Sequence, residues 1–321
     1  LANLIDQYRE DHPGIEVEIA EGTARDTVMQ LRADMLDIVF VAGTPELRQG
    51  VADKVAALYG IRYDVDHEVT ITAGATQALF TAIAAFVRPG DEVIVFEPVY
   101  DSYVPAIETV GGKAVYSRLM FPDYRPDWNH VKSLIGPRTR MIIVNTPNNP
   151  SCSLFTAEDM ATLAELTRDT DIVVLGDEVY EHICYEGQHQ SLCRHPELAA
   201  RSIVVSSFGK TYHITGWKIG YVVGPQALMT EFRKVHQFNV FTLNTPGQLG
   251  LAEYMQDASR HLGLVDFYRQ KRDFFREQMK GSRFELLPCR GTYFQLARYA
   301  AISQKPDREF AEWMTREVGV A

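Results

Sequence analysis

Apolar residues recur along this chain with two different spacings, and the two spacings alternate from about residue 45 onward. Leu47, Val51, Val55 and Leu58 share one face of a helix that Pro45 opens. Short runs of consecutive apolar residues, many of them β-branched, follow at regular intervals and are typical of buried strands. The pattern therefore predicts strands that alternate with helices.

This alternation indicates an α/β fold with a mostly parallel sheet covered by helices on both faces. Turn residues separate the elements, as in the run Pro89-Gly90-Asp91. In such sheets, ligands bind beyond the carboxyl ends of the strands. The expected helices cover 77–87 and 100–110, and the expected strands cover 68–72, 92–96, 114–118, 141–144, 172–176, 203–207 and 219–223.

The pattern divides the chain into three parts. Residues 1–44 show a β-α-β pattern of their own, with strands expected at 15–19 and 36–41. Residues 45–257 form the large α/β domain. Residues 258–321 begin with a long charged helix at 258–280 and continue with a strand at 292–296 and a helix from Asp307, which we interpret as part of a small α+β domain.

Composition narrows the range of partners. The net charge of −10 argues against a nucleic-acid or membrane-surface partner, and no apolar stretch reaches the length that spans a bilayer. The four cysteines form no C-x-x-C pair, which favours reduced thiols and a cytoplasmic protein. We therefore expect neither a nucleic-acid nor a membrane partner.

Polar groups follow three of the predicted strands. Lys210 stands on a glycine-bearing turn after the apolar run 203–205, and Asp177 and Tyr180 follow the run 172–175. Two amides, Asn145 and Asn149, follow the run 141–144. An amine, a carboxylate, a phenol and amides are the groups that pyridoxal phosphate (PLP) chemistry uses.

Five segments resemble, in order, the class I, fold-type-I PLP-dependent aminotransferases, and in particular the branch of methionine and kynurenine aminotransferases. They read TAGATQAL, EPVYDSY, NTPNNP, DEVY and SSFGKTYHITGWK, at 72–79, 97–103, 145–150, 177–180 and 206–218. The resemblance runs from about residue 44 to the end of the chain. It implies transfer of an amino group from methionine or an aromatic amino acid to a 2-oxo acid, with PLP as cofactor, in a homodimer.

The resemblance also implies roles for the residues around the cofactor ring. Lys210 would form the imine (Schiff base) with the cofactor aldehyde. Once freed, it would move a proton between the substrate Cα and C4′ of the cofactor. Asp177 would pair with the pyridine nitrogen, and Tyr180 and Asn149 would donate to the phenolic oxygen. Asn145 and Tyr100 would lie against the ring.

The cofactor phosphate would bind where a helix begins. Backbone N–H groups of Ala75, Thr76 and Gln77 stand at such a start, and Ser207 and Lys218 match the remaining phosphate ligands of the family. Each residue also has a plainer interpretation. Either lysine can be a surface charge, Asp177 can be a helix cap, and the tyrosines can be core residues.

The first 44 residues resemble part of the effector-binding domain of LysR-type regulators, through HPGIEVEI, EGTARDTVMQLR and LDIVF. Two family features have no match here: an aromatic residue just before Gly43, and an arginine that binds the substrate carboxylate beyond Ala321. We therefore expect a chain that binds PLP but transaminates poorly or not at all, with Phe310 and Trp313 left uncovered.

Other functions stay open at this stage. A PLP-dependent C–S β-lyase uses the same motifs. A non-enzymatic ligand-sensing chimera and an inactive fragment would each account for residues 1–44. A metal site is not expected, because the histidines and cysteines between 182 and 195 have no familiar ligand spacing. A nucleotide-binding site is not expected either, because the sequence has neither G-x-G-x-x-G after a strand nor a P-loop.

Overall fold

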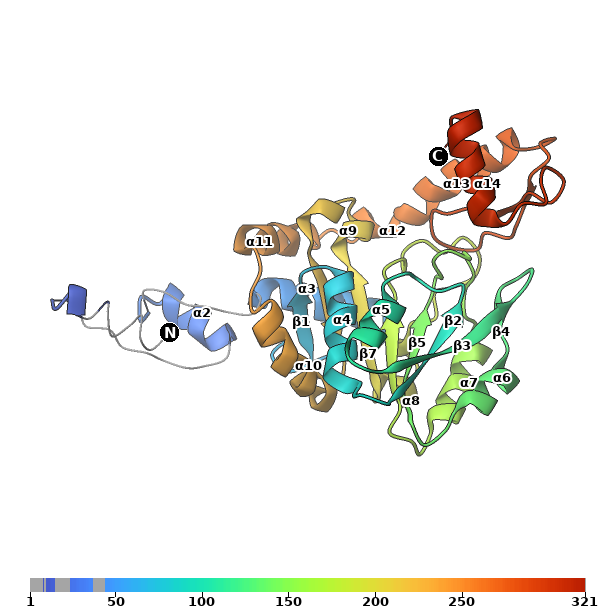
Figure 1. Cartoon of the computed structure of the whole chain (residues 1–321). Helices are drawn as coiled ribbons and strands as arrows, with labels where there is room; N and C mark the ends of the chain where they lie inside the picture. Colours follow the sequence, from blue (N-terminus) through green and yellow to red (C-terminus); the bar gives the residue numbers. More distant parts are fainter. Residues whose placement is uncertain (1–7, 9, 15–23, 37–43, 321) are drawn as a thin grey trace.

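The computed structural model describes residues 8, 10–14, 24–36 and 44–320. Within this part of the chain, one eight-stranded sheet has the order β1-β8-β7-β6-β5-β2-β3-β4 (Figure 1). Its strands are β1 (Val69–Thr72), β2 (Glu92–Glu97), β3 (Lys113–Met120), β4 (Arg125–Pro126), β5 (Thr139–Asn145), β6 (Val173–Asp177), β7 (Ser202–Ser207) and β8 (Gly220–Val223).

The sheet is mostly parallel, as predicted. Neighbours β3, β2, β5, β6 and β7 run in one direction, and β8 lies antiparallel to both β1 and β7. Parallel neighbours need crossover connections, which the helices between the strands provide. The carboxyl ends of β2, β5, β6 and β7 therefore meet at one edge of the sheet.

Helices cover both faces of the sheet, and each face has its own apolar core. On β5, Met141 and Ile143 belong to one core, and Ile142 and Val144 belong to the other. This alternation explains why the strand is apolar throughout, since both of its faces are buried. The first core packs under α4 (Ala75–Phe86), α5 (Tyr103–Thr109) and α10 (Gln226–Asn239), and the second under α3 (Pro45–Tyr59), α6 (Trp128–Leu134), α7 (Ala157–Thr167) and α8 (Pro196–Ala199).

The C-terminal part differs from two of the predictions. The single helix expected at 258–280 is two helices, α12 (Ser259–Leu262) and α13 (Leu264–Gln278), separated at Gly263, a residue type that weakens helices. The strand expected at 292–296 is wrong. The segment that leads into it packs on another loop, because the N–H groups of Arg290 and Gly291 both donate to the carbonyl of Cys152.

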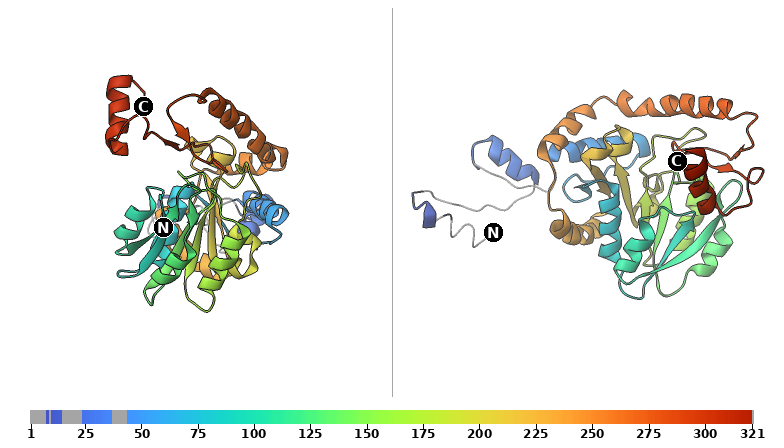
Figure 2. Two further views of the ribbon diagram at one scale, coloured as in Figure 1. Left: turned by 90° about the vertical axis from the view of Figure 1, so that its right-hand side faces the viewer. Right: turned by 45° about the horizontal axis from the view of Figure 1, so that its top comes forward.

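The helix α11 (Thr245–Tyr254) precedes this region in the chain, and a short pair of strands and a terminal helix complete it. The strands β9 (Glu285–Leu286) and β10 (Ala297–Arg298) pair antiparallel, and α14 (Asp307–Trp313) follows. In Figure 1 and in the left view of Figure 2, α13 and α14 both lie above the sheet.

The expectation that Phe310 is uncovered is wrong. Its side chain is buried and stacks on Tyr299, with 4.2 Å between ring centroids, and it also contacts Phe284 and Trp313. Trp313 itself remains partly exposed. These local aromatic contacts cover the inner face of α14.

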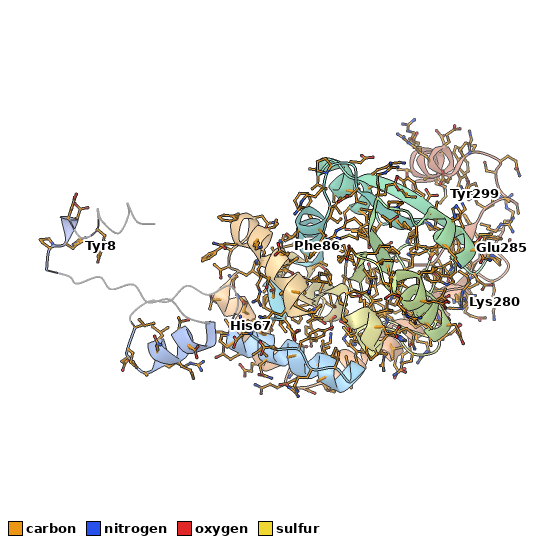
Figure 3. The ribbon with its side chains drawn as sticks, turned by 90° about the horizontal axis from the view of Figure 1, so that it is seen from below. Tyr8, His67, Phe86, Lys280, Glu285 and Tyr299 are labelled. Carbon is orange, nitrogen blue, oxygen red and sulfur yellow. The ribbon has the colours of Figure 1, made fainter. Side chains whose placement is uncertain are left out.

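The N-terminal part contains α2 (Ala24–Arg32), where the sequence predicts a helix. The strands expected at 15–19 and 36–41 lie, apart from Leu36, outside the described residues. Figure 3 shows Tyr8 at the opposite end of the molecule from Lys280, Glu285 and Tyr299. Among the described residues, no helix is both long and apolar enough to cross a bilayer.

Gly220 lets β8 approach both β7 and the turn that begins α4. A Cβ atom there would lie 2.7 Å from the carbonyl oxygen of Ser206 and 3.1 Å from the Gly74 backbone. We expect Gly220→Ala to lower the free energy of unfolding by about 1–3 kcal/mol, because backbone atoms cannot move aside cheaply. Urea denaturation measures this. Gly136→Ala is the control, since its Cβ would meet nothing within 4 Å, and an equal loss in both variants would contradict the prediction.

Candidate active site

A pocket of about 350 Å³, open to solvent, lies at the carboxyl edge of the sheet. Every residue predicted for the cofactor site lines it except Gln77. The pocket thus gathers side chains from the ends of β5, β6 and β7 and from the start of α4. The predicted residues that line it are Ala75, Thr76, Tyr100, Asn145, Asn149, Asp177, Tyr180, Ser207, Lys210 and Lys218.

The register between β5 and β6 sets one wall of the pocket. Asn145 and Asp177, the last residues of these strands, are direct partners across the parallel pair. The amide nitrogen of Asn145 donates to the Asp177 carbonyl at 3.0 Å, and its amide oxygen accepts the backbone N–H of Asn149 at 2.7 Å. Asn145 therefore ties the loop that carries Asn149 to the end of β6.

Asp177 is almost fully buried, and Tyr103 donates a 2.5 Å hydrogen bond to its Oδ2. Burial raises the pKa of Asp177 to about 6, although the Tyr103 hydrogen bond and the positive charge of Lys210 both act to lower it. Lys210 and Asp177 both line the pocket, so the amine and the carboxylate face the same space.

Lys210 lies on the single-turn helix α9 (Phe208–Thr211), directly after β7. Its Nζ lies 5.7 Å from the centroid of the Tyr293 ring, so the amine is inside the pocket. The turn is compact, because the Thr215 hydroxyl donates to the Gly209 carbonyl at 3.1 Å, and a Cβ on Gly209 would lie 3.0 Å from Thr215 Cα. Glycine is thus required beside the lysine.

Tyr180 is buried, and its hydroxyl is 3.5 Å from that of Tyr293, to which it donates. Burial raises the pKa of the Tyr180 phenol, so the group stays a proton donor at neutral pH. Tyr293 and Phe294, from the segment between β9 and β10, also line the pocket, and neither belongs to the predicted set. The sequence pattern did not reveal them, because it predicts a strand at 292–296, where both residues would pack within a sheet instead of lining a pocket.

The opposite end of the pocket is suited to an anion. Gly74, at φ +80°, precedes α4, and its Cβ position would lie 3.7 Å from Lys218 Cε, so this lysine runs beside the helix start. The first residues of α4, whose N–H groups have no partner within the helix, line the pocket together with Ser207 and Lys218. The Gln77 side chain turns elsewhere, to the Ala73 N–H and the Thr81 hydroxyl.

Comparison with known proteins identifies the family of this chain. Residues 29–321 match the family Aminotransferase class I and II. The chain belongs to this family. The match begins at residue 29, so part of the segment that resembles LysR-type regulators lies inside it, and the boundary at residue 44 stays a prediction.

Several aminotransferases are similar over most of their length. The methionine aminotransferase of Escherichia coli (strain K12) is 49% identical over 283 residues, which cover 88% of this chain and 73% of that protein. Kynurenine–oxoglutarate transaminase 1 of Rattus norvegicus is 32% identical, with coverage of 87% and 73%.

Solved structures agree. The crystal structure of YbdL from Escherichia coli, described as having a methionine aminotransferase function, superposes with a TM-score of 0.86 at 42% identity and covers 100% of this chain and 87% of that one. N-succinyldiaminopimelate aminotransferase from Mycobacterium tuberculosis gives a TM-score of 0.84 at 31% identity, with coverage of 96% and 82%.

Aminotransferases of this kind use PLP and act on amino acids and 2-oxo acids, and the pocket suits the cofactor on its own geometry. An aldehyde needs an amine, a pyridine nitrogen needs a carboxylate, and a phosphate needs N–H donors and a cation. Lys210, Asp177 and the start of α4 with Lys218 supply these at separate positions around one cavity. The residues present therefore fit the group.

A second buried carboxylate, Glu181, lies close to this aminotransferase pocket, because it bonds to Ser206, the neighbour of the lining residue Ser207. Glu181 Oε1 accepts from Lys54 Nζ at 2.6 Å, from the Ser206 hydroxyl at 2.6 Å and from the Tyr221 hydroxyl at 3.0 Å, and Tyr59 donates to Oε2. Burial acts to raise the pKa of Glu181, but Lys54 and its other donors hold it well below the usual value. No sequence motif points to this network, since its members are far apart in the chain.

The histidines and cysteines between 182 and 195 have other roles. His189 Nε2 lies 2.8 Å from Glu178 Oε2, and the Tyr63 hydroxyl lies 3.6 Å from the thiol of Cys193. Across the described ranges, no group of three or more histidine, cysteine, aspartate or glutamate side chains could hold a metal ion.

The His189–Glu178 pair should make stability depend on pH. Burial lowers the pKa of His189, but Glu178 outweighs this and raises it to about 10. The stabilisation is complete below about pH 6.5 and is lost as the pH rises through about 10. We expect the free energy of unfolding, taken as wild type minus His189→Gln, to fall by on the order of 3 kcal/mol across this window. Urea denaturation at several pH values measures the difference, and a flat difference would contradict the assignment.

Proposed function

We propose that this aminotransferase moves an amino group from methionine or an aromatic amino acid to a 2-oxo acid, with Lys210 as its covalent amine. One observation carries the proposal. The Lys210 amine and the Asp177 carboxylate, from the ends of β7 and β6, face one pocket whose other end is built for an anion.

The side chains divide the work between them. Bound PLP supplies an electron-accepting ring, and Asp177 holds a proton on the ring nitrogen by charge pairing. The free Lys210 amine would take a proton from the substrate Cα as general base and then donate it as general acid to a second carbon atom. Tyr180 and Asn149 would donate hydrogen bonds to the phenolic oxygen of the cofactor, and Lys218 and the start of α4 would hold its phosphate.

The substrate side of the pocket favours an apolar or aromatic side chain. Tyr100 and Phe294 line it, and the ring of Tyr293 lies near the reactive amine. A thioether makes favourable contacts with aromatic rings, so methionine suits this wall. The similarity to proteins named methionine aminotransferase and kynurenine transaminase supports the same choice.

A second copy of the chain suits one exposed surface. Phe238, whose side chain is 86% exposed, lies near the end of α10, which the Asn239 amide joins to Thr81 of α4 at 2.7 Å. Two more exposed aromatic side chains lie on or beside these elements. Phe80 lies on α4, and Phe241 lies in the segment just after α10. A homodimer would cover this surface. The four cysteines, all free, are consistent with a cytoplasmic location.

Covalent attachment tests the role of Lys210. Wild-type chain incubated with PLP and then reduced with borohydride should gain the mass of the reduced cofactor on the peptide that contains Lys210. Lys210→Ala should gain none. Lys218→Ala, which removes the other lysine of the pocket, is the matched control and should still be labelled at Lys210. Label elsewhere, or equal label in Lys210→Ala, would refute the proposal.

A single-turnover assay tests the reaction. With methionine and the unreduced, PLP-loaded chain, one 2-oxo acid should form per bound PLP, and Lys210→Ala should lower this rate by about 10³-fold. Mass spectrometry measures the 2-oxo acid. Release of a thiol from a cysteine S-conjugate without a matching amino transfer would instead indicate a β-lyase.

The surface near Phe238 yields a third prediction. Phe238→Lys should shift the chain from dimer to monomer, because a charge would be buried in the interface. Sedimentation velocity measures the state. Met120→Lys, at another exposed apolar side chain on β3, should leave the dimer intact. A wild-type monomer at the same concentration would contradict the dimer.

A further inference from the structure

Tyr103 makes a contact that the proposed reaction does not yet include. It is the first residue of α5, and its hydroxyl lies 2.5 Å from Oδ2 of Asp177, at the end of β6. Both side chains are about 3% exposed, so little water competes for this bond. A short bond between a phenol and a carboxylate in such surroundings is stronger than its counterpart in water.

The direction of the bond follows from the environment. Burial and the adjacent Asp177 charge both raise the pKa of Tyr103 well above its usual value, so the phenol keeps its proton and is the donor. Asp177 therefore accepts. Its other oxygen, Oδ1, accepts the backbone N–H of Val179 at 3.4 Å.

Tyr103 also touches a second pocket residue. Its ring lies edge-on to that of Tyr100, with 5.5 Å between the centroids. Tyr100 and Asp177 both line the pocket, whereas Tyr103 lies behind them. One buried side chain thus contacts two of the residues assigned to the cofactor ring.

We propose that Tyr103 is a positioning residue that holds the Asp177 carboxylate ionised and aimed into the pocket. This inference rests on the proposed function, in which Asp177 pairs with the ring nitrogen. Without the phenol, the buried carboxylate loses its strongest neutral donor and binds a proton of its own more readily. A protonated Asp177 cannot hold a positive charge on the ring nitrogen.

The other groups that face Asp177 do not replace Tyr103. Lys210 acts in the same direction through its charge, Glu178 acts in the opposite direction, and Asp177 in turn raises the pKa of Tyr180. Lys210 is also the group that would react with the cofactor, whereas Tyr103 would keep its place beside Asp177.

Carbon-13 NMR of the Asp177 side-chain carboxyl in the full chain, without added PLP, tests the proposal directly. We expect Tyr103→Phe to raise the midpoint of its titration by about one pH unit. With PLP, the same variant should bind the cofactor about tenfold more weakly, with kcat lowered about tenfold and the KM for the amino acid unchanged. Tyr63→Phe is the matched control, because it removes a buried hydroxyl that contacts Cys193.

Replacement of Tyr103 by 3-fluorotyrosine provides a second variant that keeps the packing. Its more acidic phenol donates more strongly, so the Asp177 midpoint should move down instead of up. Opposite shifts in the two variants support the proposal. An unchanged midpoint in both, or equal shifts in Tyr103→Phe and Tyr63→Phe, overturns it. Because the titration needs no turnover, this result is independent of whether the aminotransferase assignment holds.

Discussion

The in-register parallel pairing of β5, β6 and β7 determines where Asn145, Asp177 and Lys210 lie in the pocket. Asn145 pairs with Asp177 across β5 and β6, and Asp177 pairs with Val205 across β6 and β7. A shift of one residue would turn each of these side chains to the other face of the sheet. Chemistry from segments far apart in the chain is therefore collected by backbone hydrogen bonds, with both apolar cores holding the register.

Buried carboxylates near the end of β6 are each matched by a donor from another element. Asp177 accepts from Tyr103, Glu178 contacts His189, and Glu181 accepts from Lys54. Burying an unpaired carboxylate would cost several kcal/mol, so each acid depends on its partner for stability. These pairs join α3, α5 and the loop before α8 to the site.

Much of the fold and part of the site could be predicted from the sequence, because both depend on local order. Continuous apolar runs identify the strands, and polar groups directly after them, such as Lys210 and Asp177, must meet at one edge of a parallel sheet. Tyr293 could not be found in this way, since it reaches the pocket through a loop that packs on Cys152 instead of a strand. The partners Tyr103 and Lys54 depend on tertiary contacts, and no spacing in the sequence encodes these.

The central claim is that one pocket holds an amine and a buried carboxylate at opposite sides of a cofactor ring. A crystal structure of the chain soaked with PLP tests it most directly. The account predicts density in the pocket, with the pyridine nitrogen within hydrogen-bond distance of Asp177 and continuous density to Lys210 Nζ. A ring bound elsewhere, or bound with its nitrogen turned away from Asp177, would contradict the account.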